Sequence, residues 1–157
     1  MISVKDQAHL DLEELAKRRE DVYFTEQYQK LILEAQEHVQ QVEPDEVDID
    51  STTNLLLDVR EPDEFASGYI RKERHLTIPR GRLEFVAIKK ILHEYGSDVN
   101  IITYCFKGPR GLLAAYQLKK MGFTNVVNLK DGLKNWLDKG RTLRSYFGEI
   151  ALVKKVN

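Results

Sequence analysis

The amino-acid sequence predicts an α/β fold: a parallel five-stranded sheet with helices on both faces, preceded by an N-terminal helical extension. Two observations carry this prediction. Short apolar runs of the kind that form buried parallel strands alternate with longer segments whose apolar residues recur at helical spacing. This alternation is typical of a parallel sheet covered on both faces, because each strand is followed by a crossover helix.

Length and composition limit the class of protein. At 157 residues the chain suits one domain plus an extension, and a hydrophobic fraction of 42% is enough for a core. The 24 basic and 25 acidic residues leave a net charge of −1, so we expect no nucleic-acid partner. A single cysteine excludes an intramolecular disulfide and a cysteine-based metal cluster, and the four histidines lack metal-ligand spacing. We therefore expect neither a metal nor a cofactor.

The first 42 residues are predicted to form a helical arm. Residues 5–42 carry two apolar stripes at close to helical spacing, formed by Leu10, Leu12, Leu15 and Ala16 and then by Tyr28, Leu31, Ile32, Ala35 and Val39. Such an arm caps the domain or joins a second copy, so a homodimer through it is one expectation. Signal-peptide and membrane-spanning patterns are absent. We predict a cytoplasmic protein without a membrane partner, or a periplasmic one if a leader has been removed.

The domain itself is predicted at residues 43–140, and it opens with a short helical turn at Pro44–Val47. Its first strand is expected at Leu55–Val59, with Asp58 near the end of the strand. A buried carboxylate must be paired or hydrogen-bonded, and Arg60 is the natural partner.

The remaining elements follow from turn residues and apolar spacing. In chain order we expect a short helix that starts at Glu61–Phe65 and stops at Gly68, a strand at His75–Pro79, a helix from Arg80 to about His93, a strand at Ile101–Tyr104, a helix closed by Gly122, a strand at Thr124–Leu129, a helix from Asp131-Gly132 to Gly140, and a tail at 141–157 that packs back onto the protein.

The most informative stretch surrounds the only cysteine. Cys105 directly follows the strand Ile101–Tyr104, and a helical pattern begins a few residues later. A helix N-terminus offers unpaired backbone N–H groups and a partial positive charge, and a loop in front of it aims further N–H groups at one point. Gly108 allows the unusual backbone angles of such a loop, while Lys107 and Arg110 add two cations. These surroundings favour a thiolate and an anionic substrate.

Other polar residues are expected at the same place. Ligands of parallel α/β sheets bind beyond the C-terminal ends of the strands. Three segments far apart in sequence, Asp58–Arg60, Pro79–Arg80 and Cys105, would meet at that edge. The alternative for Cys105 is a buried structural cysteine, because free cysteine is among the most buried residue types.

Four segments of the chain resemble the rhodanese domain of sulfurtransferases. They are LLLDVREPDEFASGYI, TIPRGRLE, IITYCFKGPRGLLAAYQLKKMGF and VVNLKDGLKNW, and together they span about residues 43–140. The loop Cys105-x-x-Gly108-x-Arg110 matches the six-residue loop of single-domain members. The helical arm and the sequence Pro79–Glu84 look most similar to the polysulfide-sulfurtransferase branch, whose members are homodimers with arginines around the cysteine.

The chain departs from the family pattern at three places. Gly68-Tyr69-Ile70 replaces the frequent Gly-His-Ile, and Asp131-Gly132 replaces the frequent Gly-Gly. A charged stretch, Arg71–His75, stands where small residues are usual. We expect these changes to alter the surface and the access of substrate and to leave the chemistry intact.

The resemblance implies a sulfurtransferase in which Cys105 takes sulfane sulfur from polysulfide or thiosulfate, forming a persulfide. A nucleophilic acceptor such as cyanide or a thiol then removes the outer sulfur, which is covalent catalysis in two steps. The residues expected to bind the anionic donor are Arg110, Arg80, Arg60, Lys107, Gly108 and Phe106, with Asp58 as structural support. Alternatives remain for three of them: Arg60 could form a structural ion pair with Asp58, and Arg80 and Lys107 could be solvated surface charges.

Two other functions share this fold. Phosphatase-like or arsenate-reductase-like relatives carry five residues between the cysteine and the arginine, whereas four separate Cys105 from Arg110 here. The loop also lacks an acidic residue that could protonate a leaving group. A non-catalytic interaction module is the second alternative, although domains in that role often lack the cysteine.

Overall fold

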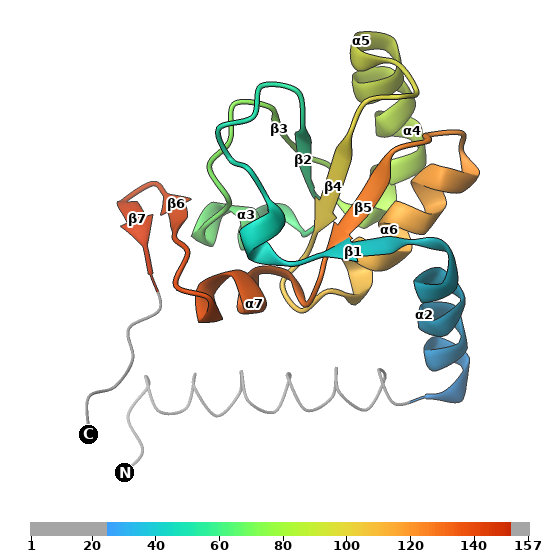
Figure 1. Cartoon of the computed structure of the whole chain (residues 1–157), viewed down its shortest axis with the longest axis horizontal. Helices are drawn as coiled ribbons and strands as arrows, with labels where there is room; N and C mark the ends of the chain where they lie inside the picture. Colours follow the sequence, from blue (N-terminus) through green and yellow to red (C-terminus); the bar gives the residue numbers. More distant parts are fainter. Residues whose placement is uncertain (1–24, 152–157) are drawn as a thin grey trace. The chain divides into compact units, whose positions relative to one another are not determined.

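The structure is a computed structural model that describes residues 25–151, and the chain divides into two compact units, Met1–Glu34 and Ala35–Asn157. The second unit is built on a five-stranded, fully parallel sheet with the strand order β1-β5-β4-β2-β3. The strands are β1 (Gln40–Val42), β2 (Leu55–Asp58), β3 (His75–Thr77), β4 (Ile101–Tyr104) and β5 (Val126–Leu129). Figure 1 shows the sheet close to edge-on, with β4 at its centre.

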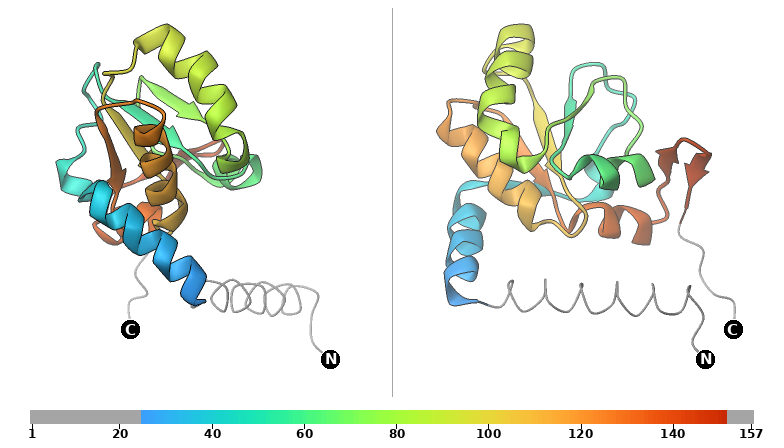
Figure 2. Two further views of the ribbon diagram at one scale, coloured as in Figure 1. Left: turned by 90° about the vertical axis from the view of Figure 1, so that its right-hand side faces the viewer. Right: turned by 180° about the vertical axis from the view of Figure 1, so that it is seen from behind.

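Helical segments alternate with these strands, as the sequence predicts. They are α2 (Glu26–His38), η1 (Pro44–Glu46), α3 (Pro62–Ser67), η2 (Arg80–Arg82), α4 (Leu83–Ala87), η3 (Ile88–Leu92), α5 (His93–Tyr95), α6 (Pro109–Lys120) and α7 (Gly132–Asp138). A hairpin of β6 (Leu143–Ser145) and β7 (Gly148–Ile150) follows α7. Figures 1 and 2 show α3, α7 and the hairpin on one face of the sheet, with α4 and α6 on the other.

Alternation along each strand divides the buried side chains between the two faces. One face packs against α7 through the core residues Val47, Leu56, Ile70, Ile102, Tyr104, Leu129, Leu133, Trp136 and Leu143. On the opposite face the Thr103 hydroxyl donates to the Gly111 carbonyl at 2.8 Å and contacts Asn128 Oδ1 at 3.0 Å. These buried polar groups thus satisfy one another while fixing α6 against β4 and β5.

One predicted boundary is wrong. The sequence predicts helix through residue 42 and a domain that starts at residue 43, but α2 ends at His38 and Gln40–Val42 form the edge strand β1. The error arises because Val39 fits the helical spacing of the arm, while an edge strand with two glutamines lacks an apolar run. Pairing with β5 decides the outcome, and Asn128 Nδ2 donates to Gln41 Oε1 at 3.0 Å.

Two further segments differ in detail from the prediction. The helix expected from Arg80 to His93 begins with a 3-10 turn, contains the π-helical segment η3 and ends at Tyr95. The first part of the tail forms the hairpin β6–β7 and packs back onto the domain, since Leu143 is buried and Tyr69 and Arg144 form a β-bridge. Residues 152–157 of the tail lie outside the described residues.

The N-terminal arm is described only in part. The helix α2 agrees with the second apolar stripe, whereas the first stripe lies in residues 1–24, outside the described part. The homodimer that we expect through the arm therefore stays a prediction. Within residues 25–151, none of the helices has both the length and the apolar character needed to cross a membrane.

The closeness of α6 to the sheet gives a stability prediction. A Cβ atom on Gly111 would lie 2.4 Å from Asn128 Oδ1 and 3.2 Å from backbone atoms of Tyr104. Gly111→Ala should therefore lower the free energy of unfolding by about 1–3 kcal/mol, as overpacking of a core does. Urea denaturation measures this, and Gly81→Ala is the matched control because a Cβ at Gly81 meets no atom within 4 Å. Equal stability of both variants would contradict the described packing.

Candidate active site

The thiol of Cys105 lies at the C-terminal end of the central strand. Cys105 is 1% exposed, and its Sγ accepts a hydrogen bond from the backbone N–H of Gly108 at 3.0 Å. The loop between them leads into α6, with Pro109 at the first helical position. Gly108 has a φ of +116°, and a Cβ there would lie 3.1 Å from the Cα atom of Asp131. Only glycine meets both requirements, so the loop curves tightly around the sulfur.

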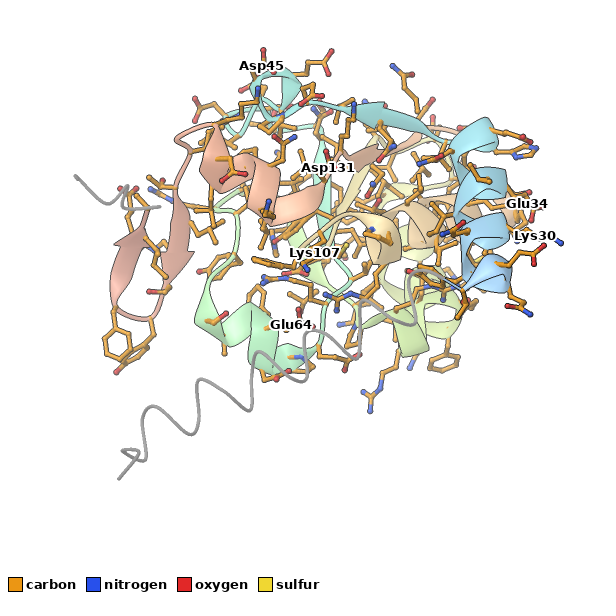
Figure 3. The ribbon with its side chains drawn as sticks, turned by 90° about the horizontal axis from the view of Figure 1, so that it is seen from below. Lys30, Glu34, Asp45, Glu64, Lys107 and Asp131 are labelled. Carbon is orange, nitrogen blue, oxygen red and sulfur yellow. The ribbon has the colours of Figure 1, made fainter. Side chains whose placement is uncertain are left out.

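The N-terminus of α7 holds this loop from the other side. The backbone N–H of Leu133 donates to the Cys105 carbonyl at 2.9 Å, and that of Lys134 donates to the Phe106 carbonyl at 3.0 Å. A Cβ on Gly132 would lie only 2.3 Å from the Cys105 carbonyl oxygen. The sequence gives Asp131-Gly132 only as the start of a helix and as a departure from the family pattern, whereas in the structure these residues support the loop. Figure 3 shows Asp131 and Lys107 at this edge of the sheet.

Arg110 is held by an acid that the sequence reasoning missed. Its Nη1 and Nη2 donate to Glu64 Oε1 and Oε2 at 2.6 and 2.9 Å, and the two side chains are 30% and 27% exposed. The hydrogen bond from Arg110 lowers the pKa of Glu64 against the opposing effect of burial. Glu64 also closes the capping box of α3 with Glu61. In the sequence Glu64 belongs only to the start of the helix expected at Glu61–Phe65, and no local pattern links it to Arg110.

The pair Asp58–Arg60 is buried beneath the site. Asp58 is 0% and Arg60 3% exposed, and Nε and Nη2 of the arginine lie within 3.1 Å of the carboxylate oxygens. The Arg60 guanidinium also donates to two backbone carbonyls, that of Glu64 at 3.2 Å and that of Gly68 at 2.6 Å. Burial lowers the pKa of Arg60, but the hydrogen bond and charge of Asp58 outweigh it and raise that pKa. Arg60 therefore forms the structural ion pair with Asp58 that the sequence left open as the alternative, and its contact with an anionic donor stays a prediction.

The other predicted residues lie at the surface of the same edge. Arg80 follows β3, donates its backbone N–H to the Val59 carbonyl at 3.1 Å and pairs with Glu84 at 2.9 Å. Phe106 and Lys107 are exposed at the tip of the loop. Within residues 25–151 no three His, Cys, Asp or Glu side chains gather as metal ligands would.

Tyr104, which directly precedes Cys105, forms a pair of titratable residues with His75. The hydroxyl of Tyr104 contacts His75 Nε2 at 2.6 Å, and both rings belong to an aromatic cluster with Phe65 and Tyr69. Burial lowers the pKa of His75 to about 4, although the charge of Asp58 acts in the opposite direction. Burial and the same carboxylate raise the pKa of Tyr104. At neutral pH both groups are therefore uncharged.

A parallel sheet in this order, with one thiol held by a loop before a helix N-terminus, defines a small α/β protein with a single-cysteine site. Comparison with known families is consistent: residues 34–139 match the rhodanese-like domain. The chain belongs to the rhodanese-like domain family. The match starts before β1, in agreement with the corrected boundary of the domain.

Several relatives carry related sequences. The uncharacterised protein YqhL of Bacillus subtilis is 36% identical over 81 residues, which cover 52% of this chain and 59% of YqhL. A protein named sulfurtransferase from Allochromatium vinosum is 31% identical over 91 residues, covering 58% of this chain and 78% of that protein. The solved human single-domain sulfurtransferase TSTD1 superposes with a TM-score of 0.54 at 26% identity, covering 64% of this chain and 97% of that one.

The matched region is smaller than some of these proteins. It spans 59% of YqhL and 46% of the putative sulfur carrier protein YrkF of Bacillus subtilis. The likeness therefore concerns the rhodanese-like domain rather than whole proteins.

The buried ion pair gives a prediction about Arg60. Arg60→Lys keeps the charge but loses the two-pronged contact with Asp58 and the bonds to the backbone of α3, so we expect the free energy of unfolding to fall by about 2 kcal/mol or more. Arg80→Lys, at an exposed ion pair, should change it by less than about 1 kcal/mol. Denaturant titration of the two variants compares them. An Arg60→Lys protein as stable as the wild type would contradict the structural role.

Acid sensitivity follows from His75. The unfolded chain binds a proton at His75 near the ordinary pKa of 6.5, whereas the folded protein does so only near pH 4. Stability should therefore fall as the pH drops through this window, by up to about 3 kcal/mol. His75→Gln should flatten this part of the curve of unfolding free energy against pH, and His93→Gln, at an exposed site, should not. A slope that is the same in all three proteins would contradict the assignment.

Proposed function

We propose that the protein is a sulfurtransferase that carries sulfane sulfur as a persulfide on Cys105. The observation that carries this proposal is the hydrogen bond from the Gly108 N–H to Cys105 Sγ at 3.0 Å, in a loop that opens into the N-terminus of α6. Such a loop stabilises negative charge on sulfur in both the thiolate and the persulfide. Membership of the rhodanese-like family and the relatives named as sulfurtransferases support the same activity.

The reaction divides into two transfers. The Cys105 thiolate attacks the terminal sulfane sulfur of polysulfide or thiosulfate, a new S–S bond forms at Sγ, and the donor leaves with the electron pair of the broken S–S bond. A thiol or cyanide then attacks the outer sulfur and releases the thiolate. Each step is a nucleophilic displacement at sulfur, so ping-pong kinetics are expected.

The burial of the thiol and the short loop favour sulfur over a phosphoryl group. Cys105 is 1% exposed and four residues separate it from Arg110, so the loop is one residue shorter than in phosphatase-like relatives. The carboxylate nearest to the loop arginine is Glu64, which forms a two-pronged ion pair and has a lowered pKa because of it. An acid held ionised in this way is a poor proton donor for a leaving group.

The proposal is tested by intact mass spectrometry after incubation with polysulfide and, separately, with thiosulfate. We expect a gain of about 32 Da, one sulfur atom, in the wild type and none in Cys105→Ser, because the serine hydroxyl cannot form the covalent intermediate. Addition of cyanide should remove the gained mass and yield thiocyanate. A gain that persists in Cys105→Ser, or none with either donor, would overturn the proposal.

A further inference from the structure

The arginines expected around Cys105, at the C-terminal edge of the sheet, form ion pairs with acidic residues. The sequence suggests a cationic site, because three arginines and one lysine converge on Cys105. In the structure each of those arginines is within 3 Å of a carboxylate oxygen. The charge that an incoming anion meets is therefore much smaller than the sequence implies.

Arg110 has the most direct bearing on the donor. Both of its terminal nitrogens face both oxygens of Glu64, which is the strongest geometry of an arginine–carboxylate pair. The hydrogen bond from Arg110 and its charge keep the pKa of Glu64 low, so the acid is ionised at neutral pH. A dianion that binds Arg110 must displace this carboxylate or lie beside it, and either arrangement costs free energy in a partly buried place.

The other two arginines of the edge are also paired with acids. Arg80 pairs with Glu84 at 2.9 Å, and the buried Arg60 is neutralised by Asp58. Lys107 makes no ion pair among the described residues, and Asp131, whose backbone lies against Gly108, places an acidic residue beside the same loop.

Asp131, next to the cysteine loop, has an unfavourable backbone conformation. Among residues 25–151 it is the one residue other than glycine with a positive φ, at 57°. Glycine would adopt that angle without strain, so the acid costs stability at a position next to the loop.

We propose that Glu64, Glu84 and Asp131 set the donor specificity of the site, so that it takes sulfur from a singly charged organic persulfide in preference to the thiosulfate dianion. The proposal rests on the proposed function and narrows its substrate class. A site whose arginines are each paired with a carboxylate gains little from a second negative charge on the donor, while the loop N–H groups still stabilise one charged sulfur.

The transfer from such a donor balances without a further reactant. The donor anion R–S–S⁻ and the Cys105 thiol together bring one proton and one negative charge. Sγ attacks the outer donor sulfur, the bond between Sγ and that sulfur forms, and the bond between the two donor sulfurs breaks. The RS group keeps the electron pair and takes the proton given up by Cys105, leaving as the thiol RSH, and the negative charge remains on the Cys105 persulfide. With thiosulfate the leaving group is sulfite, which carries two charges away past the same acids.

The test compares 2-hydroxyethyl persulfide, a monoanion, with thiosulfate as donors to the full chain. Formation of the Cys105 persulfide is followed by mass without an acceptor, and turnover is followed as thiocyanate with cyanide as acceptor. We expect kcat/KM to be at least about tenfold higher for the persulfide. We also expect kcat/KM for thiosulfate to change less than about twofold between about 20 and 500 mM salt, because screening matters little where each arginine is paired with a carboxylate. Thiosulfate that reacts as fast as the persulfide, or slows steeply with salt, would overturn the inference alone. If neither donor adds sulfur to Cys105, the proposed function is overturned as well.

A matched pair of variants isolates the ion pair. Glu64→Gln keeps the hydrogen bond to the α3 N-terminus and removes the negative charge that faces Arg110, so it should shift the ratio of kcat/KM values about tenfold toward thiosulfate. Asp63→Asn removes the same charge from the adjacent, exposed position on α3 and should shift that ratio less than about twofold. Asp131→Asn should shift it in the same direction as Glu64→Gln, since asparagine also tolerates a positive φ. Equal shifts in Glu64→Gln and Asp63→Asn, or no shift in Glu64→Gln, would overturn the assignment.

Discussion

The ion pair between Asp58 and Arg60 connects the sheet to the elements around the thiol. Asp58 is the last residue of β2, and its carboxylate is fully buried, so it requires a partner inside the protein. Arg60 supplies that charge and also binds carbonyls at Glu64 and Gly68, in and just after α3. The guanidinium further lies 5.8 Å from the ring centre of Tyr104, the residue that precedes Cys105. One buried contact thus fixes the end of β2, the placement of α3 and the ring beside the thiol.

From this pair a series of contacts leads to the reactive sulfur. The helix α3, tied down by Arg60, carries Glu64, and Glu64 holds Arg110 at the start of α6. The loop between Cys105 and Arg110 is in turn fixed by backbone N–H groups at the start of α7. Because elements before and after the loop in sequence hold it, the Gly108 N–H points at Sγ in advance of any substrate. Such preorganisation lowers the cost of developing charge on sulfur.

The arginines near the thiol have separate roles although the sequence groups them together. Arg60 is buried in an ion pair with Asp58 and has a structural role. Arg110 and Arg80 remain partly exposed and form ion pairs with Glu64 and Glu84, respectively. The number of basic residues in a motif is therefore a poor measure of the charge at the site. The acids decide it, and they come from α3, α4 and the turn before α7.

The sequence by itself determined the class of fold, the position of the thiol and the family. Apolar runs at Leu55–Val59 and Ile101–Tyr104 give buried strands because only apolar side chains fit between two helical layers, and a parallel sheet brings its C-terminal ends together. Tertiary structure alone decided three matters. Pairing with β5 makes Gln40–Val42 a strand, although local spacing favours helix. Asp131-Gly132 support the cysteine loop because they pack against it. Glu64 pairs with Arg110, 46 positions away in sequence, because the fold brings α3 and α6 together. Contacts between distant segments depend on the whole fold, and no local pattern of residues encodes them.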